Sequence, residues 1–133
     1  MARYLSPEWL AEADAAAAAS TSLREATATV SLVVQQEVSG GPDGDTAYHV
    51  VVDHGAVSVV PGMAAQPDVT FTEDHTTAVA IGRGELSAQA AFMVGKLRVS
   101  GDLERLLTHQ DAFSGIDDVF NELRAGTTWP AAG

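Results

Sequence analysis

Four histidines are the side chains of this chain best suited to acid–base or metal chemistry near neutral pH. No two of them have the i, i+4 spacing of a helical metal site, and the 133 residues include no cysteine. The sequence also lacks a Gly-x-Ser-x-Gly nucleophile elbow and the Gly-Lys-Ser/Thr motif of a phosphate-binding loop. We therefore expect no catalytic residues, no metal ion and no cofactor. The histidines are His49, His54, His75 and His109.

His49 and Asp53 form the one acid–base pairing that the sequence offers. They lie four residues apart in a segment of alternating apolar residues, and an extended strand would place both side chains on one face. A general base that is oriented by a carboxylate needs a cleft for its substrate, and the flanking residues indicate none. We expect a structural or surface role for both side chains. An enzyme that acts on an apolar substrate through them is the weakest alternative.

The composition is acidic and nearly half apolar. There are 18 acidic and 7 basic residues, which gives a formal charge of −11, and 46% of the residues are hydrophobic. This charge repels phosphate backbones and anionic bilayers, so we expect no nucleic-acid binding and no stable membrane association. No apolar run reaches the roughly 20 residues of a membrane span, and the first residues do not resemble a secretion signal. We expect a cytoplasmic protein that is a monomer or a weak dimer.

The first half of the chain predicts one helix and three strands. Ser6 and Pro7 are typical of a helix start and precede an alanine-rich run, which predicts a helix over 7–19. Apolar and polar residues then alternate from residue 28 to 38, as in a half-buried strand. Turn-forming residues separate this segment from two further short apolar runs. Together they predict an antiparallel meander, with strands at 28–38, 48–52 and 57–60.

The second half adds two strands and several short helices. Strands are predicted at 68–72 and 96–100, with helices at 74–81, 87–93 and from 102 onward. The residues at 113–115 predict an interruption, with a new helix start at Ser114 and an end near 124. We expect the tail, 127–133, to be either a mobile end or a strap over the core. The whole chain, 1–133, is predicted to be a single α+β domain.

Three sequence segments carry a resemblance to a known family. They read PDVTFT at 67–72, GELSAQAAFM at 84–93 and GKLRVSGD at 95–102. In this order and spacing they closely resemble the sterol carrier protein 2 family, over a core of about 26–124. The resemblance implies a five-stranded, mostly antiparallel sheet covered by helices. It also implies an apolar tunnel for a sterol, a fatty acid or another lipid, in a stand-alone bacterial member of actinobacterial type.

The resemblance suggests which residues would line such a tunnel. They are apolar, and they lie on the last two predicted strands and the helices around them. At residue 94 many members of the family carry a glutamine, and the valine found here implies a more apolar ligand or no ligand. The predicted lining residues are Phe71, Val79, Phe92, Met93, Val94, Leu103, Leu106, Leu107, Phe113 and Phe120.

The same residues have two interpretations. The first is non-catalytic binding of a small hydrophobic molecule, as a carrier or presenting protein. The second is a protein-interaction module with a collapsed tunnel that assists a partner enzyme. An exposed Trp129 and an acidic helix that begins near Asp117 favour this second interpretation.

Overall fold

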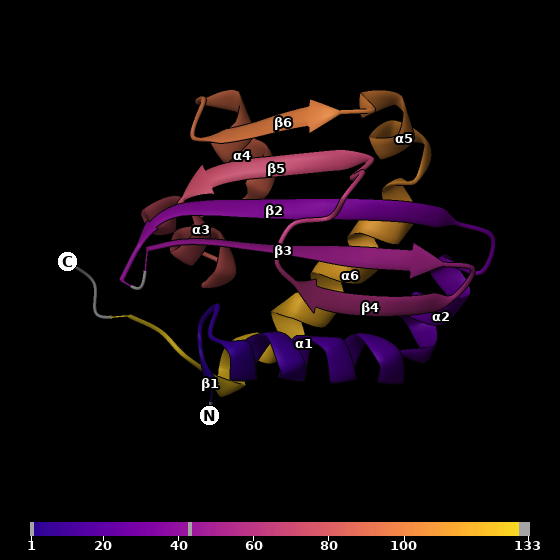
Figure 1. Cartoon of the computed structure of the whole chain (residues 1–133), viewed down its shortest axis with the longest axis horizontal. Helices are drawn as coiled ribbons and strands as arrows, with labels where there is room; N and C mark the ends of the chain where they lie inside the picture. The colour runs from indigo at the N-terminus through magenta and orange to yellow at the C-terminus, as the bar shows by residue number, and fades with distance from the viewer. Residues whose placement is uncertain (1, 43, 131–133) are drawn as a thin grey trace.

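The alternating segments of the sequence form a five-stranded sheet, which the computed structural model shows in Figure 1. The structure describes residues 2–42 and 44–130. The strand order is β4-β3-β2-β5-β6, with β2 and β5 parallel and every other neighbouring pair antiparallel. The predicted α+β fold with a five-stranded, mostly antiparallel sheet is therefore confirmed. The strands are β2 (Ser31–Gly41), β3 (Gly44–Asp53), β4 (Ala56–Pro61), β5 (Val69–Asp74) and β6 (Leu97–Gly101).

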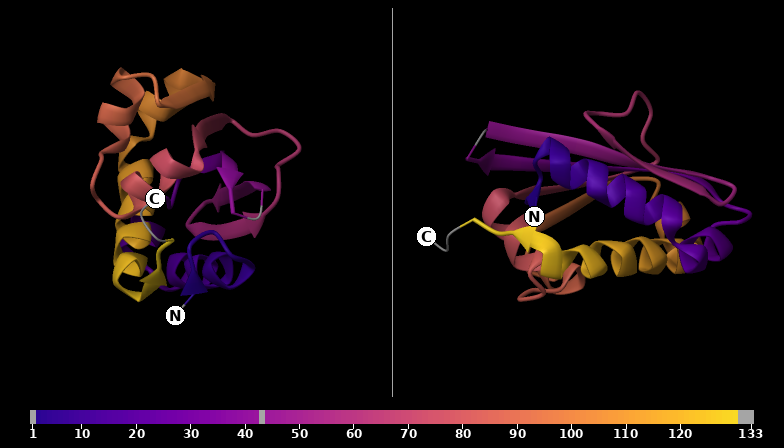
Figure 2. Two further views of the ribbon diagram at one scale, coloured as in Figure 1. Left: turned by 90° about the vertical axis from the view of Figure 1, so that its left-hand side faces the viewer. Right: turned by 90° about the horizontal axis from the view of Figure 1, so that it is seen from below.

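One face of the sheet, here called the inner face, carries the core. On the central strand β2 its residues include Leu32 and Val34, which are buried and lie opposite Val52 and Val50 of β3. The other face carries no helix, and Figure 2 shows the connection of residues 62–68 projecting from it. The molecule thus has two layers, with all of its longer helices on the inner face.

Two long helices and one short helix cover the β4 end of the inner face. Helix α1 (Pro7–Ala19) has the predicted bounds, and the Ser6 hydroxyl accepts a hydrogen bond from the Trp9 backbone N–H at 3.2 Å. It packs on β4 and on α6 (Gln110–Leu123). Helix α2 (Thr21–Ala26) was not predicted and packs against α6.

Three short helices surround the other end of the sheet. They are α3 (His75–Gly82), α4 (Ala88–Met93) and α5 (Leu103–Thr108). Each begins directly after the start residue that the sequence predicted, because the side chain of Asp74, Ser87 or Asp102 caps it by accepting a hydrogen bond from a first-turn backbone N–H. Local capping chemistry therefore sets where these helices start.

The predicted interruption at 113–115 is wrong. Helix α6 runs unbroken through these residues, and the chain breaks instead at His109, between α5 and α6. Gly115 has a packing role, because a Cβ there would lie 3.0 Å from Cδ1 of Leu23. The missing side chain lets α2 and α6 approach each other, and this tertiary contact outweighs glycine's low helix propensity.

The end of the described chain is a strap and not a free tail. After a short 3₁₀ helix, η1 (Arg124–Gly126), strand β7 (Thr127–Thr128) pairs in parallel with β1 (Ala2–Arg3). Trp129 is half-buried, with its ring centroid 4.8 Å from that of Tyr4, so its predicted exposure is wrong. The rest of the predicted tail, 131–133, lies outside the described residues. Within the described ranges, no helix is long and apolar enough to cross a membrane.

Candidate ligand-binding site

The ten predicted lining residues share one property: none of them is fully buried. Five are half-buried, namely Phe71, Val79, Leu106, Phe113 and Phe120. The other five have exposed fractions of 54% for Phe92, 78% for Met93, 67% for Val94, 48% for Leu103 and 67% for Leu107. The fully buried core is built from other side chains, among them Leu23, Leu32, Val52 and Val69.

The five exposed side chains lie near the two ends of the edge strand β6. Met93 and Phe92 end α4, Val94 follows them, and Leu103 and Leu107 belong to α5. In Figure 1, α4 stands at one end of β6 and α5 at the other. We call these five residues the apolar rim. Large apolar side chains are thus concentrated where the chain wraps around one edge of the sheet.

The inner face is less covered near the apolar rim than elsewhere. Phe71 of β5 and Val99 of β6 pair across the two strands and are half-buried. Val50 and Val59 occupy the same face on β3 and β4 and are buried, with 3% and 6% exposed. Figure 2 shows α1 at the β4 end of the sheet, far from β6. The Phe71–Val99 pair is therefore the part of the β5–β6 inner face that a ligand could cover, since Val69 and Leu97 on the same strands are 0% and 5% exposed.

The structure separates the predicted aromatic residues into two groups. The rings of Phe71 and Phe113 meet edge to face with centroids 6.1 Å apart, which joins β5 to α6 beside the exposed half of the sheet. Phe120 instead stacks on Trp9 at 5.7 Å and lies 6.2 Å from Tyr48. Phe120 therefore belongs to the packing between α1 and α6. The expectation that it lines the same site as Phe71 has no support from this arrangement.

Two hollows among the described residues are too small for a lipid. One hollow, bordered by Tyr4, His75 and Pro130, holds about 40 Å³. A second, between Leu23, Val57 and other core residues, has no room for a water molecule. A lipid site needs roughly 300 Å³ or more. The tunnel therefore remains a prediction, and the structure presents the apolar residues on an open surface.

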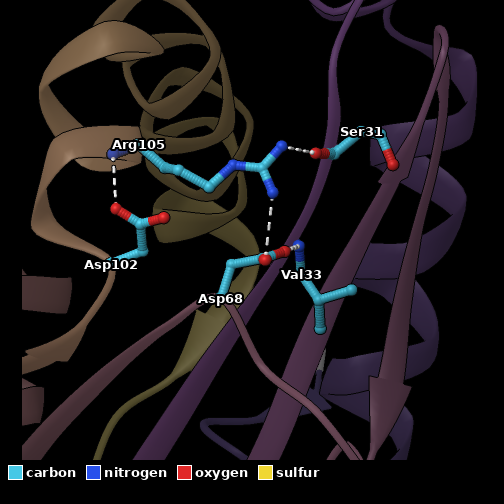
Figure 3. A network of polar contacts seen from close by, with 5 residues as sticks. All are labelled: Ser31, Val33, Asp68, Asp102 and Arg105. Atoms are coloured by element: carbon cyan, nitrogen blue, oxygen red, sulfur yellow. Dashed lines mark hydrogen bonds and ion pairs between the residues drawn. The ribbon is translucent and has the colours of Figure 1, made fainter.

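A polar network holds α5 against the sheet beside this surface. Figure 3 shows the Arg105 guanidinium between the Asp68 carboxylate, at 3.1 Å, and the Ser31 carbonyl oxygen, at 2.9 Å. The same carboxylate accepts a hydrogen bond from the Val33 backbone N–H at 2.7 Å. Asp102 adds a backbone hydrogen bond to the Asp68 carbonyl oxygen at 2.7 Å. These contacts fix where α5 starts, and with it the α5 part of the apolar rim.

Gly101 permits the close approach on which this network depends. Its φ is +98°, and a Cβ there would collide with the Asp68 carbonyl oxygen. We expect Gly101→Ala to lower the free energy of unfolding by more than about 1 kcal/mol, measured by urea denaturation. Gly95 is the matched control, because its φ is +80° and its Cβ would meet open space. Equal losses in Gly101→Ala and Gly95→Ala would show that the collision contributes nothing.

His49 and Asp53 have separate hydrogen-bond partners in the structure. His49 Nδ1 donates to the Gly62 carbonyl oxygen at 2.8 Å, and Asp53 contacts the neighbouring His54 at 2.7 Å on the exposed surface. The weakest alternative, in which Asp53 orients His49 as a base, therefore has no support, since each has a different partner. Within residues 2–42 and 44–130, no three His, Cys, Asp or Glu side chains are grouped to hold a metal ion.

Two polar residues on the inner face were not predicted from the sequence. Gln36 lies between Tyr48 of β3 and Phe71 of β5, and its Oε1 is buried with no hydrogen-bond partner. Glu73 is 9% exposed, and burial together with the nearby charge of Asp74 raises its pKa to about 7. Alternation within the strand predicted at 28–38 puts Gln36 on the face of Leu32 and Val34, whereas Glu73 lies beyond the end of the strand predicted at 68–72. Only the strand register reveals that they are neighbours.

The fold and this surface define an α+β domain with its helices on one face of a five-stranded sheet and an apolar edge. The family model of the SCP-2 sterol transfer family matches residues 11–114. The chain belongs to this family.

Known proteins agree with this assignment. The chain is 35% identical to Sterol carrier protein 2 of Homo sapiens over 68 residues, which are 50% of this chain and 12% of that protein's length. A crystal structure of sterol carrier protein 2 superposes with a TM-score of 0.74 at 22% identity, covering 90% of this chain and 98% of that one. A conserved hypothetical protein from Thermus thermophilus gives 0.73 at 21% identity, covering 100% and 96%. The two structures bear on the fold alone.

Proposed function

We propose that this domain binds a small hydrophobic molecule of the lipid class without changing it covalently, and acts as a carrier or presenting protein. The ligand lies against the inner face of β5 and β6, between α4, α5 and α6. The observation that carries this proposal is the apolar rim beside a half-covered part of the sheet. The family name, SCP-2 sterol transfer, supports the same class of ligand.

Burial of apolar surface supplies the driving force. Phe92 and Leu107 are 54% and 67% exposed, and each large side chain that becomes fully buried contributes about 1.5–3 kcal/mol. A ligand that covers the rim, together with Phe71 and Phe113, would gain several such contributions. Burial of this apolar surface accounts for affinity without an ionic anchor.

The contacts of Trp129 favour a lipid over a partner protein. The accessory-module alternative depended on an exposed tryptophan and on an acidic helix beginning near Asp117. The tryptophan packs on Tyr4 and against Gly82, and Asp117 lies inside α6, which begins at Gln110. The charge of −11 also opposes prolonged residence on anionic membranes. We propose a carrier that exchanges its ligand through solution in the cytoplasm.

Replacing Phe92 by Ser tests the site. We expect the affinity for a fluorescent fatty acid such as cis-parinaric acid to fall about tenfold, because the variant removes apolar area that the ligand would cover. Fluorescence titration at micromolar protein measures the change. Met63 is the matched control, since it is 64% exposed in the connection at 62–68 on the opposite face.

The outcomes distinguish a failure of the proposed lipid binding from a failure of the proposed location of the site. Met63→Ser should leave the affinity unchanged, and both variants should unfold at the same urea concentration as the parent. If the parent protein binds neither a fluorescent fatty acid nor a fluorescent sterol, the proposed function is wrong. If both variants lose affinity equally, the ligand does not lie on the β5–β6 half of the inner face.

A further inference from the structure

Gln36 and Glu73 are diagonal neighbours on the inner face of the sheet. Gln36 pairs with Phe71 across β2 and β5, and Glu73 follows Phe71 by two residues on the same face. Val38 and Leu97, the partners of Glu73 on β2 and β6, are both buried. The two polar side chains therefore adjoin Phe71, the aromatic residue at the centre of the proposed lipid site.

Neither polar group has its hydrogen-bonding capacity filled by the described residues. Gln36 Oε1 is buried without a partner, and the carboxyl of Glu73 makes no hydrogen bond or ion pair within residues 2–42 and 44–130. The preceding residue on β2 shows the contrast. Gln35 points to the opposite face, where its Oε1 accepts from the Ala64 backbone N–H at 2.8 Å and its Nε2 donates to Glu37 at 2.9 Å.

A buried acceptor without a donor is costly, so Gln36 Oε1, beside the largely buried side chain of Glu73, indicates what the ligand supplies at this position. We infer that Gln36 and Glu73 form the polar end of the site and bind the hydroxyl group of a neutral lipid, such as a sterol or a long-chain alcohol. This inference rests on the proposed function and names its ligand class. The apolar part of the molecule would extend from Phe71 toward the apolar rim.

The charges around this position oppose a carboxylate ligand. Glu73 is followed by Asp74, and the phenols of Tyr4 and Tyr48 are close enough to Glu73 for its charge to help raise their pKa values, which burial raises most. Within the described ranges, no salt bridge brings a cation to Glu73. A fatty-acid anion would place a second negative charge beside Glu73. A hydroxyl group can donate to a carboxylate and accept from an amide, so it fits both side chains.

Ligands of equal chain length test the inference in the intact protein. At pH 8, dodecan-1-ol and dodecanoate are compared by their displacement of the neutral dye 1-aminoanthracene. We expect the parent protein to bind the alcohol about tenfold more tightly. Gln36→Met should lower the alcohol affinity about tenfold relative to the parent, after correction for the variant's own affinity for the dye. Glu73→Gln should raise the dodecanoate affinity about tenfold, because it removes the opposing charge.

Gln35→Met is the control for a buried glutamine. This variant loses two hydrogen bonds on the face of the sheet opposite the inner face, so the midpoint of its thermal unfolding should fall. Its preference for the alcohol should equal that of the parent. Two results would overturn the inference, provided that the dye still binds. One is equal affinity of the parent for the two ligands, and the other is an unchanged preference for the alcohol in both Gln36→Met and Glu73→Gln. Failure of the dye and of both ligands to bind overturns the proposed function itself.

Discussion

Replacing Trp9 by Ala should lower the free energy of unfolding by about 3–5 kcal/mol, which is a large share of the roughly 5–15 kcal/mol of a small domain. Trp9 is 4% exposed and its ring stacks on Phe120 at 5.7 Å. The rings of Trp9 and Tyr4 meet edge to face with their centroids 5.1 Å apart. The Trp9 Nε1 donates a hydrogen bond to the Thr127 hydroxyl at 3.1 Å. One side chain thus joins α1 to α6, to the start of the chain and to the terminal strap.

The second tryptophan provides the comparison. Trp129 is half-buried and packs on Tyr4, so Trp129→Ala should cost about 1 kcal/mol. Urea denaturation followed by far-ultraviolet circular dichroism measures both variants without depending on tryptophan fluorescence. If Trp9→Ala costs no more than Trp129→Ala, the ring of Trp9 does not organise the packing between α1 and α6.

Local sequence signals predicted those parts of the fold that depend on local chemistry. Helix α1 has the predicted bounds because Ser6 and Pro7 determine its first turn, and Asp74 and Asp102 cap α3 and α5 in the same way. The break between α5 and α6 was misplaced because Gly115 looked like a helix end. Its small size serves contact with Leu23, more than 90 residues earlier in the chain, which no local pattern contains.

The candidate site was predictable only in part, for the same reason. The family pattern pointed to Phe92 and Leu107 as lining residues, and the structure leaves both exposed beside β6. The proximity of Gln36 and Glu73 was not predicted, because they lie 37 residues apart and become neighbours only through the parallel pairing of β2 with β5. That pairing requires the crossover at 62–68, and alternation along single strands does not reveal it.

Glu73 should make the stability of the domain fall as the pH rises. Burial, followed by the charge of Asp74, raises its pKa to about 7 from its ordinary value of 4.5. The folded state therefore holds this proton more tightly than the unfolded state does. Stability from this group is complete below about pH 4.5 and is lost as the pH rises through 7. The full difference corresponds to about 3 kcal/mol, at 1.36 kcal/mol for each pH unit.

Glu73→Gln removes this dependence, because a glutamine side chain does not titrate. We expect the free energy of unfolding of the variant, relative to the parent, to increase by about 3 kcal/mol between pH 4 and pH 8. Urea denaturation at the two pH values measures the change, and the titrating groups that the two proteins share cancel. Glu12→Gln on the exposed face of α1 removes the same formal charge in solvent, so it separates burial from net charge. A constant difference between Glu73→Gln and the parent at both pH values would mean that folding does not change the pKa of Glu73.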